Sequence, residues 1–266
     1  MAEEGDDLTL ITAININDLP YVGPVSVKQT QMISGDVMRS QISTSISIAG
    51  EAQEIMSVFL INLNEGNIYF VNDRDSNYVQ MSFAELDQML EAANPAEEDT
   101  AGAALELTKD MVQRNEDNAK PIGSFGPCVP VEFDLVLSGA GENAGYKSSM
   151  QGQMWLSRGI DNSSLFLDFK DRALERLQNS MAGNAAFFGI PAAVNLSPEW
   201  FDRINQAISG IPVEAEFKVT MPVKDETITY GITMNLEEYS TAYIEQSLLE
   251  VPSGYQEVDF SEFRMY

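Results

Sequence analysis

Several segments of this chain alternate strictly between apolar and polar residues. The clearest runs from Val213 to Met221, where every odd-numbered residue is apolar and every even-numbered residue is polar. Because successive side chains of a strand point to opposite faces of a sheet, this pattern predicts a strand with one dry and one solvated face. One-sided wetting is typical of antiparallel sheets, whereas parallel sheets are usually covered on both faces.

Similar patterns predict strands both before and after a central helical part. The predicted strands are 8–16, 25–33, 37–48, 56–63, 67–71, 129–138, 146–156, 213–221 and 227–234. Short links rich in Gly, Asn and Asp separate the first five, which indicates consecutive hairpins.

Helices are predicted in two places. A helical insert is expected around 82–120, because Ser82 and Glu85 have the spacing of a capping box and apolar residues follow at helical intervals. Within this insert, 103–114 is expected to form a second helix. Two further helices fall within 164–210: one over 164–181, and one in which Ser197 caps and Pro198 takes the first helical position.

The order of these elements is strands, helix, strands, helices and strands. Regular strand–helix–strand alternation is missing, so the pattern predicts an α+β fold rather than a doubly wound one. We expect one domain over 8–266, preceded by a flexible acidic N-terminus at 1–7.

The charge balance narrows the range of partners. The chain has 41 acidic and 15 basic residues and a formal net charge of −26, so a nucleic-acid backbone would be repelled. Its longest apolar runs are too short to span a bilayer, which predicts no transmembrane segment. The acidic first residues are not those of a signal peptide, which suits either a cytosolic protein or an exported chain after signal removal.

The residue types present also narrow the chemistry. The chain has no histidine and a single cysteine, Cys128, which excludes histidine-dependent nucleophiles, histidine-ligated zinc and an internal disulfide. Paired carboxylates could run acid–base chemistry, but with 41 acids such pairs are inevitable. We therefore expect a protein that is not an enzyme and uses no cofactor or metal. Catalysis through carboxylates stays open as a third hypothesis, after the ligand-binding and interaction hypotheses given below.

Two glycine-rich or acidic motifs have simpler interpretations as turns. Residues 139–145 contain Gly-x-Gly, but a strand follows instead of a helix, which favours a hairpin over a dinucleotide site. Residues 73–77 have part of the ligand spacing of a calcium loop. Tyr78 replaces its glycine and Ala84 its final acid, so a polar hairpin turn is predicted.

Short motifs spread over most of the chain resemble a bacterial family of unknown function, DUF4412. They comprise 145–148, 154–157, 211–213 and 249–258, and more loosely 38–39, 66–69 and 78–81. The cysteine that usually follows Gly-Tyr in the family is Ser148 here, so any role of that cysteine does not carry over.

The resemblance implies a shape and a location. DUF4412 is similar to the LolA/LolB lipoprotein carriers, whose fold is a curved antiparallel sheet, an open half-barrel, with helices packed on the concave face. Such proteins are exported, which implies a periplasmic or extracellular chain whose signal peptide has been removed. The resemblance identifies no catalytic residues.

This shape leads to a ligand hypothesis: an apolar cleft between sheet and helices that holds an acyl chain or another hydrophobic small molecule. The candidate lining residues are Phe133, Leu135, Met154, Phe169, Trp200, Phe201, Phe217, Val219, Ile232 and Met234. The alternative is a structural or interaction module whose helices fill the concave face and which binds a protein partner, for example through an exposed strand edge.

Overall fold

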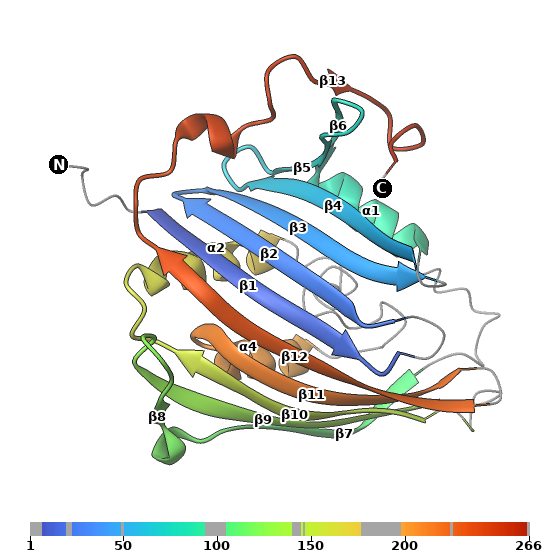
Figure 1. The fold of residues 1–266 in the computed structure, drawn as a ribbon, viewed down its shortest axis with the longest axis vertical. Helices are drawn as coiled ribbons and strands as arrows, with labels where there is room; N and C mark the ends of the chain where they lie inside the picture. Colours follow the sequence, from blue (N-terminus) through green and yellow to red (C-terminus); the bar gives the residue numbers. More distant parts are fainter. Residues whose placement is uncertain are drawn as a thin grey trace.

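The computed structural model describes residues 7–19, 23–48, 51–93, 105–139, 145, 147–176, 198–223 and 226–264. The strands in these ranges form one large sheet in the order β13-β6-β5-β4-β3-β2-β1-β12-β11-β10-β9-β7, with β8 beside β9 (Figure 1). Neighbouring strands are antiparallel, except for the short parallel pair of β13 and β6. The sheet is open, because β13 and β7 lie at its two ends.

The strands extend close to the predicted ranges. Their bounds are β1 Asp7–Asn17, β2 Val25–Ser34, β3 Val37–Ile48, β4 Glu51–Asn62, β5 Asn67–Asn72, β6 Asn77–Ser82, β7 Leu105–Arg114, β8 Lys120–Pro121, β9 Pro127–Gly139, β10 Lys147–Ser157, β11 Ile211–Val223, β12 Glu226–Ser240 and β13 Gln256–Glu257. The prediction of a mainly antiparallel α+β fold is confirmed. It missed β6 and the two-residue strands, and β1 begins at Asp7, which is buried and not part of a flexible N-terminus.

Three α-helices are described: α1 Phe83–Ala93, α2 Ser163–Arg176 and α4 Pro198–Ala207. Short 3-10 helices occur at η1 Glu116–Asn118 and η3 Gln246–Leu249. The part of the predicted 164–181 helix beyond 176 lies outside the described residues. None of the helices in the described ranges is both long and apolar enough to cross a membrane.

The predicted capping box at the start of α1 is confirmed. Ser82 Oγ accepts a hydrogen bond from the Glu85 backbone N–H at 3.2 Å, and Glu85 Oε2 accepts one from the Ser82 backbone N–H at 2.8 Å. Both backbone N–H groups at this helix start are therefore satisfied by side chains. The pKa of the Glu85 carboxyl is lowered first by the hydrogen bond that the Ser82 hydroxyl donates to Glu85 Oε2 at 2.7 Å, and next by the one from the Ser82 backbone N–H.

The predicted helix at 103–114 is wrong, because 105–114 forms the edge strand β7 paired with β9. A register shift between Leu107 and Lys109 interrupts the two-residue alternation of this strand. Lys109, Asp110 and Met111 are exposed, as is usual at a sheet edge. The bulge and the edge position together hide the strand pattern in the sequence.

The two predicted turns join antiparallel neighbours. Residues 73–76 form the turn between β5 and β6, so the polar-turn prediction is confirmed. The glycine-rich segment connects β9 to its antiparallel neighbour β10, as a hairpin requires. Most of that loop itself, 140–144 and 146, lies outside the described residues.

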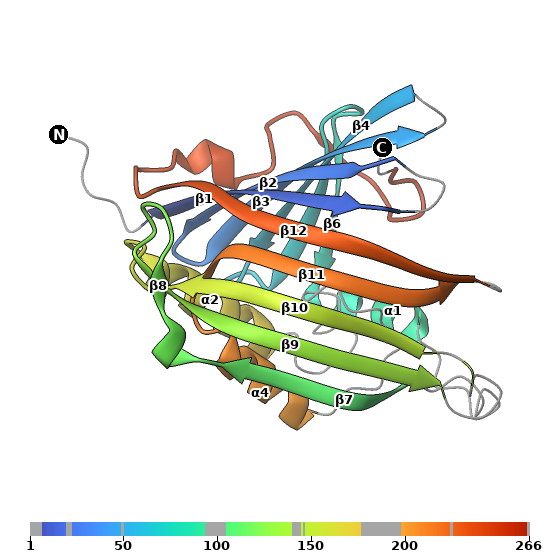
Figure 2. The same cartoon turned by 60° about the horizontal axis from the view of Figure 1, so that its bottom comes forward.

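The helices lie together on one face of the sheet, which we call the inner face (Figures 1 and 2). Phe169 and Ala173 of α2 pack there against Ile33, Met38 and Ile61, all of them buried. Full burial of each large apolar side chain contributes about 1.5–3 kcal/mol, so this cluster fixes α2 on the sheet.

The opposite, outer face is covered near β4–β6 by the C-terminal segment, residues 241–264. Val251 and Tyr255 of this segment pack against the buried residues Val58, Leu60 and Val71. Figure 1 shows the segment returning from the end of β12 to the β6 side of the sheet, where it adds β13.

Candidate functional site

The inner face of β1, β12 and β11 carries a continuous row of apolar side chains. Strand register places Phe217 opposite Ile232, and Ile232 opposite Ile16 of β1. One inner position further along, Ile14 lies opposite Met234. The predicted residues Phe217, Ile232 and Met234 are therefore brought together.

The burial of the inner-face side chains changes along each of these strands, from one end to the other. On β1, Leu8 and Leu10 are 0% and 2% exposed, whereas Ile14 and Ile16 are partly exposed. On β11, Val213 is 1% exposed, whereas Phe217 is partly exposed. The buried end is the end that α2 covers.

The partly exposed end forms a surface that we call the open-end patch. Its residues are Ile14, Ile16, Phe217, Val219, Ile232 and Met234. Four of the ten predicted lining residues belong to it. Partly exposed apolar groups that share one face are typical of a hydrophobic binding surface.

A second group of predicted residues lies beside this patch and packs under α4. Phe133 and Leu135 are buried in a cluster with Ile204 of α4, and Met154 and Phe217 pack against that cluster. The rings of Phe133 and Phe217 meet edge to face with centroids 5.5 Å apart. Phe217 therefore joins this filled cluster to the open-end patch.

The remaining predicted residues do not join these two groups in the described structure. Phe169 is 2% exposed, but it belongs to the cluster under α2 with Ile33 and Met38. Trp200 and Phe201 fall in α4, as the Ser-Pro start predicted, but their side chains lie outside the described part of the structure.

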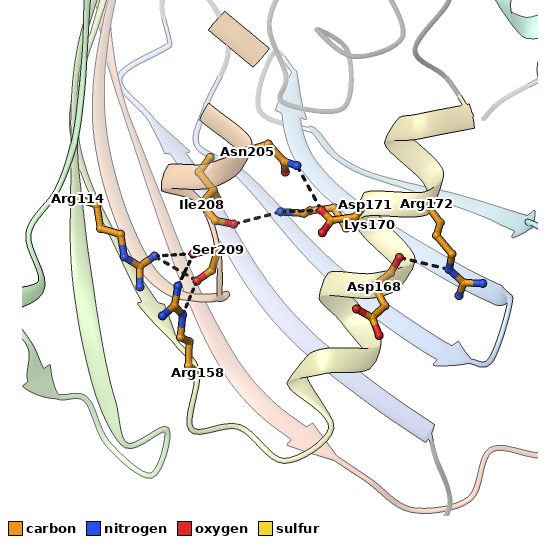
Figure 3. A network of polar contacts seen from close by, with 9 residues as sticks. All are labelled: Arg114, Arg158, Asp168, Lys170, Asp171, Arg172, Asn205, Ile208 and Ser209. Atoms are coloured by element: carbon orange, nitrogen blue, oxygen red, sulfur yellow. Dashed lines mark hydrogen bonds and ion pairs between the residues drawn. The ribbon is translucent and has the colours of Figure 1, made fainter. Parts of the chain in front are cut away.

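Three cations hold the C-terminal end of α4 (Figure 3). Arg114 Nη1 donates to the carbonyl oxygens of Ala207 and Ser209, both at 3.1 Å. Arg158 donates to Ser209 O at 3.1 Å and to Ser209 Oγ at 2.6 Å. Cations at a helix C-terminus each stabilise it by about 0.3–1 kcal/mol, and here they fix the position of α4 over the sheet.

Lys170 of α2 is the third cation, and it connects the two helices. Its Nζ donates to the carbonyl oxygen of Ile208 at 3.2 Å, while Asn205 of α4 donates to Asp171 of α2 at 3.2 Å (Figure 3). Burial lowers the pKa of Lys170, and the nearby Asp171 carboxylate partly offsets that effect. The helices are therefore held as a pair.

Further ion pairs attach the helices to the sheet margins. Arg203 of α4 pairs with Asp110 of β7, and Arg172 of α2 pairs with Asp36 in the β2–β3 turn. Sequence patterns missed these residues, because each pair joins positions far apart in the chain and surface charges carry no periodic signal.

The outer face bears a groove of about 770 Å³ over β10, β11 and β12, and its lining, part polar and part apolar, also includes Phe217 and Ile232 of the open-end patch. Its outer-face lining residues include Gln151, Gln153, Trp155, Glu214, Glu216, Lys218 and Thr233. Lys120 Nζ lies 4.0 Å from the centroid of the Trp155 ring. The polar half of the alternation predicted a solvated face here but gave no sign of a groove.

The carboxyl groups with shifted pKa values do not have the shift that a general acid needs. The shifted carboxyl pKa values in the described chain, those of Glu85 and Asp134, are both lowered, for Asp134 chiefly by the hydrogen bond from Lys109. A general acid needs the opposite shift. Burial raises the pKa of the Cys128 thiol, which keeps it protonated. Among the described residues, no group of three or more His, Cys, Asp or Glu side chains is placed to hold a metal ion.

No protein-family model matches the chain, and none of the curated proteins matches it significantly. The resemblance to DUF4412 therefore remains a hypothesis that rests on its short motifs.

Proposed function

We propose that this protein is a non-enzymatic bacterial envelope protein that holds an acyl chain or a similar hydrophobic ligand on the inner face of its sheet. In this proposal the sheet is a LolA-like half-barrel and the helices lie on its concave face. The residues in contact with the ligand are those of the open-end patch, with the partly buried Met154 at its margin.

The observation that carries the proposal is the burial gradient along β1, β11 and β12. An apolar row that only filled a core would be buried along its whole length, as Leu8, Leu10 and Val213 are. Instead Phe217, Ile232 and their neighbours keep part of their surface exposed. Covering a dodecyl chain would gain about 0.8 kcal/mol per methylene, roughly 9 kcal/mol in all, before the ordering costs of binding are subtracted.

The envelope location rests on the motif resemblance, and the net charge of the chain is −26. This charge gives a soluble carrier that is repelled from anionic membrane surfaces, so the protein would release its ligand without adhering to the bilayer. Tracking the native protein through cell fractionation tests the location; recovery in the cytosol would overturn it.

Ligand binding is tested by native mass spectrometry and by displacement of a fluorescent acyl probe. We expect the purified protein to take up one acyl ligand, and Ile232→Glu to weaken binding at least tenfold, because a carboxylate would face the chain. The matched control is Thr233→Glu, one residue along β12 on the outer face, which should bind like wild type. No acyl uptake by wild type, or equal loss in both variants, would contradict the proposal.

A second candidate is the interaction module with a filled inner face. It is favoured by one observation: Ile204 and Phe169 already fill the space under α4 and α2. This candidate predicts that the protein takes up no acyl probe and that a specific protein is recovered with it from its native host.

A further inference from the structure

We propose, resting on the ligand function above, that the ligand is an uncharged amphiphile: an acyl chain with a neutral hydroxyl or N–H amide head. The chain lies on the open-end patch. The head contacts Gln29 and Gln31, which together with the buried Thr12 and Ser40 beside them form a group of inner-face polar residues on β1–β3 that we call the amide row.

The amide row occupies the inner face, where apolar residues would be expected. Gln29 lies opposite Thr12, and Gln31 lies opposite Ser40. Gln29 Nε2 donates to Ser40 Oγ at 3.0 Å, and Gln31 Nε2 contacts the Met38 sulfur at 3.8 Å. These contacts orient both amides.

The amide oxygens are the groups left for a ligand. Gln29 and Gln31 are partly exposed, and within the described chain their Oε1 atoms accept no hydrogen bond. A hydroxyl or amide N–H of a ligand would satisfy them at a place where water is partly excluded.

The amide row is adjacent to the open-end patch. Gln29 is one inner position from Val27, which lies opposite Ile14 of the patch. One inner position corresponds to about 6.8 Å along a strand. A single small amphiphile therefore reaches both surfaces.

The inner face has no charge that could bind an ionic head. On β1, β2, β3 and β9–β12, every second residue points to the inner face, and none of these residues is charged. The ranges, in strand order, are Leu8 to Ile16, Val25 to Ile33, Met38 to Ile46, Val129 to Leu137, Ser148 to Leu156, Val213 to Met221 and Ile228 to Leu236. This holds in a chain with 41 acidic and 15 basic residues.

The charged groups nearest to this surface either are bound to other groups of the protein or are acidic. On β7, Asp110 pairs with Arg203 and Arg114 binds the end of α4. Lys170 of α2 binds Ile208 O and Asp171. At the strand starts, Glu51 and Glu226 align with inner positions and are exposed.

These charges disfavour an anionic head. An unpaired carboxylate on this surface would lose hydration without gaining a cation, and the acids at the strand starts would repel it. A neutral head loses less hydration and regains hydrogen bonds from the amide row.

The experiment compares probes with the same chain and different heads: dodecanoylglycerol, dodecanoate and dodecyltrimethylammonium. Each displaces a fluorescent acyl probe from the full chain at a pH well above the carboxyl pKa. We expect dodecanoylglycerol to bind at least about tenfold more tightly than dodecanoate, the ratio that corresponds to 1.4 kcal/mol. It should also bind more tightly than dodecyltrimethylammonium, because among the three heads only the glycerol head can donate hydrogen bonds to the amide oxygens.

Introducing a positive charge at the amide row gives the second arm of the experiment. Gln31→Lys should raise dodecanoate affinity above that of wild type, because it supplies the missing cation. Gln41→Lys is the matched control, since Gln41 lies on the outer face of β3 and contacts Met56. If Gln31→Lys does not fold, Gln31→Leu should selectively weaken dodecanoylglycerol.

The outcomes separate the two proposals. If no probe binds, the ligand function fails and the head-group inference fails with it. If the probes bind but dodecanoate equals dodecanoylglycerol, or the cationic probe binds most tightly, only the head-group inference is overturned. Equal effects of the Gln31 and Gln41 substitutions would remove the amide row as the site of the head.

Discussion

At the scale of single residues, Gly152 decides how closely the inner face packs. It lies on β10 between Phe133 of β9 and Phe217 of β11, and the two rings meet over it. An added Cβ would lie 2.1 Å from the Glu216 carbonyl oxygen and 2.6 Å from a Phe217 ring carbon. A glycine here lets aromatic side chains from both neighbouring strands cover the backbone.

We therefore expect Gly152→Ala to lower the free energy of unfolding by about 2–3 kcal/mol, as overpacking against backbone does. Gly231→Ala on β12 is the control, because nothing lies within 4 Å of its added Cβ. Urea unfolding of both variants measures the difference. Equal midpoints for the two variants would show that β10 and β11 separate easily.

Lys170 gives a pH-dependent prediction. Burial lowers its pKa below the ordinary value of 10.5, so between the folded pKa and 10.5 the unfolded chain holds more protons. The free energy of unfolding then rises with pH across that window. We expect the wild-type value minus the Lys170→Met value to increase as the pH rises toward 10.5.

Urea titrations at several pH values test this, with Lys218→Met of the outer face controlling for the loss of one positive charge. A difference between wild type and Lys170→Met that does not change with pH would mean that Lys170 is solvated in the folded protein.

At the scale of elements, the sequence predicted what depends on local pattern. Strand β3 was predicted to the residue, and Ser82 with Glu85 located the start of α1, because alternation and capping act over a few positions. Strand β7 was mistaken for a helix, because a bulge near Lys109 breaks its alternation.

What the sequence could not predict is which distant residues meet. The ten candidate residues came from apolar positions alone, so they mixed the α2 cluster of Phe169 with the α4 cluster of Phe133. The burial gradient that distinguishes Phe217 from Val213 depends on where the helices lie. Strand register, needed to place the amide row, is likewise set by pairing across the sheet.

The packing of the C-terminal segment against the outer face can be tested with two aromatic residues. Tyr255 covers Val58, Leu60 and Val71, and its hydroxyl lies 3.1 Å from an Asp73 carboxylate oxygen. Phe260, five residues later, is 47% exposed. The same segment thus offers a partly buried and an exposed aromatic residue.

We expect Tyr255→Ala to lower the free energy of unfolding by about 1–2 kcal/mol through lost apolar contact, and Phe260→Ala to change it little. Thermal and urea unfolding of the pair measure this. Equal effects of the two substitutions would mean that the segment does not stay on the outer face in solution.

At the scale of the whole molecule, the distribution of charge is the unifying feature. The chain has a net charge of −26, yet the inner positions from Val213 to Met221 and from Ile228 to Leu236 are uncharged. Most charged residues of the described chain lie on the outer face, at strand ends and on the helices, and Asp110 on the inner side of β7 is paired with Arg203 of α4. This distribution of charge fits the proposed function, because it leaves an uncharged surface for the ligand that we propose.

The most direct test of this account is to locate a bound ligand. A dodecanoylglycerol analogue with a photoreactive diazirine in its chain is bound, illuminated and mapped by residue-level mass spectrometry. We predict labels on Phe217, Ile232 or Met234 of the open-end patch. Labels confined to the outer groove at Gln151, Glu216 or Lys218, or no specific label at all, would contradict it.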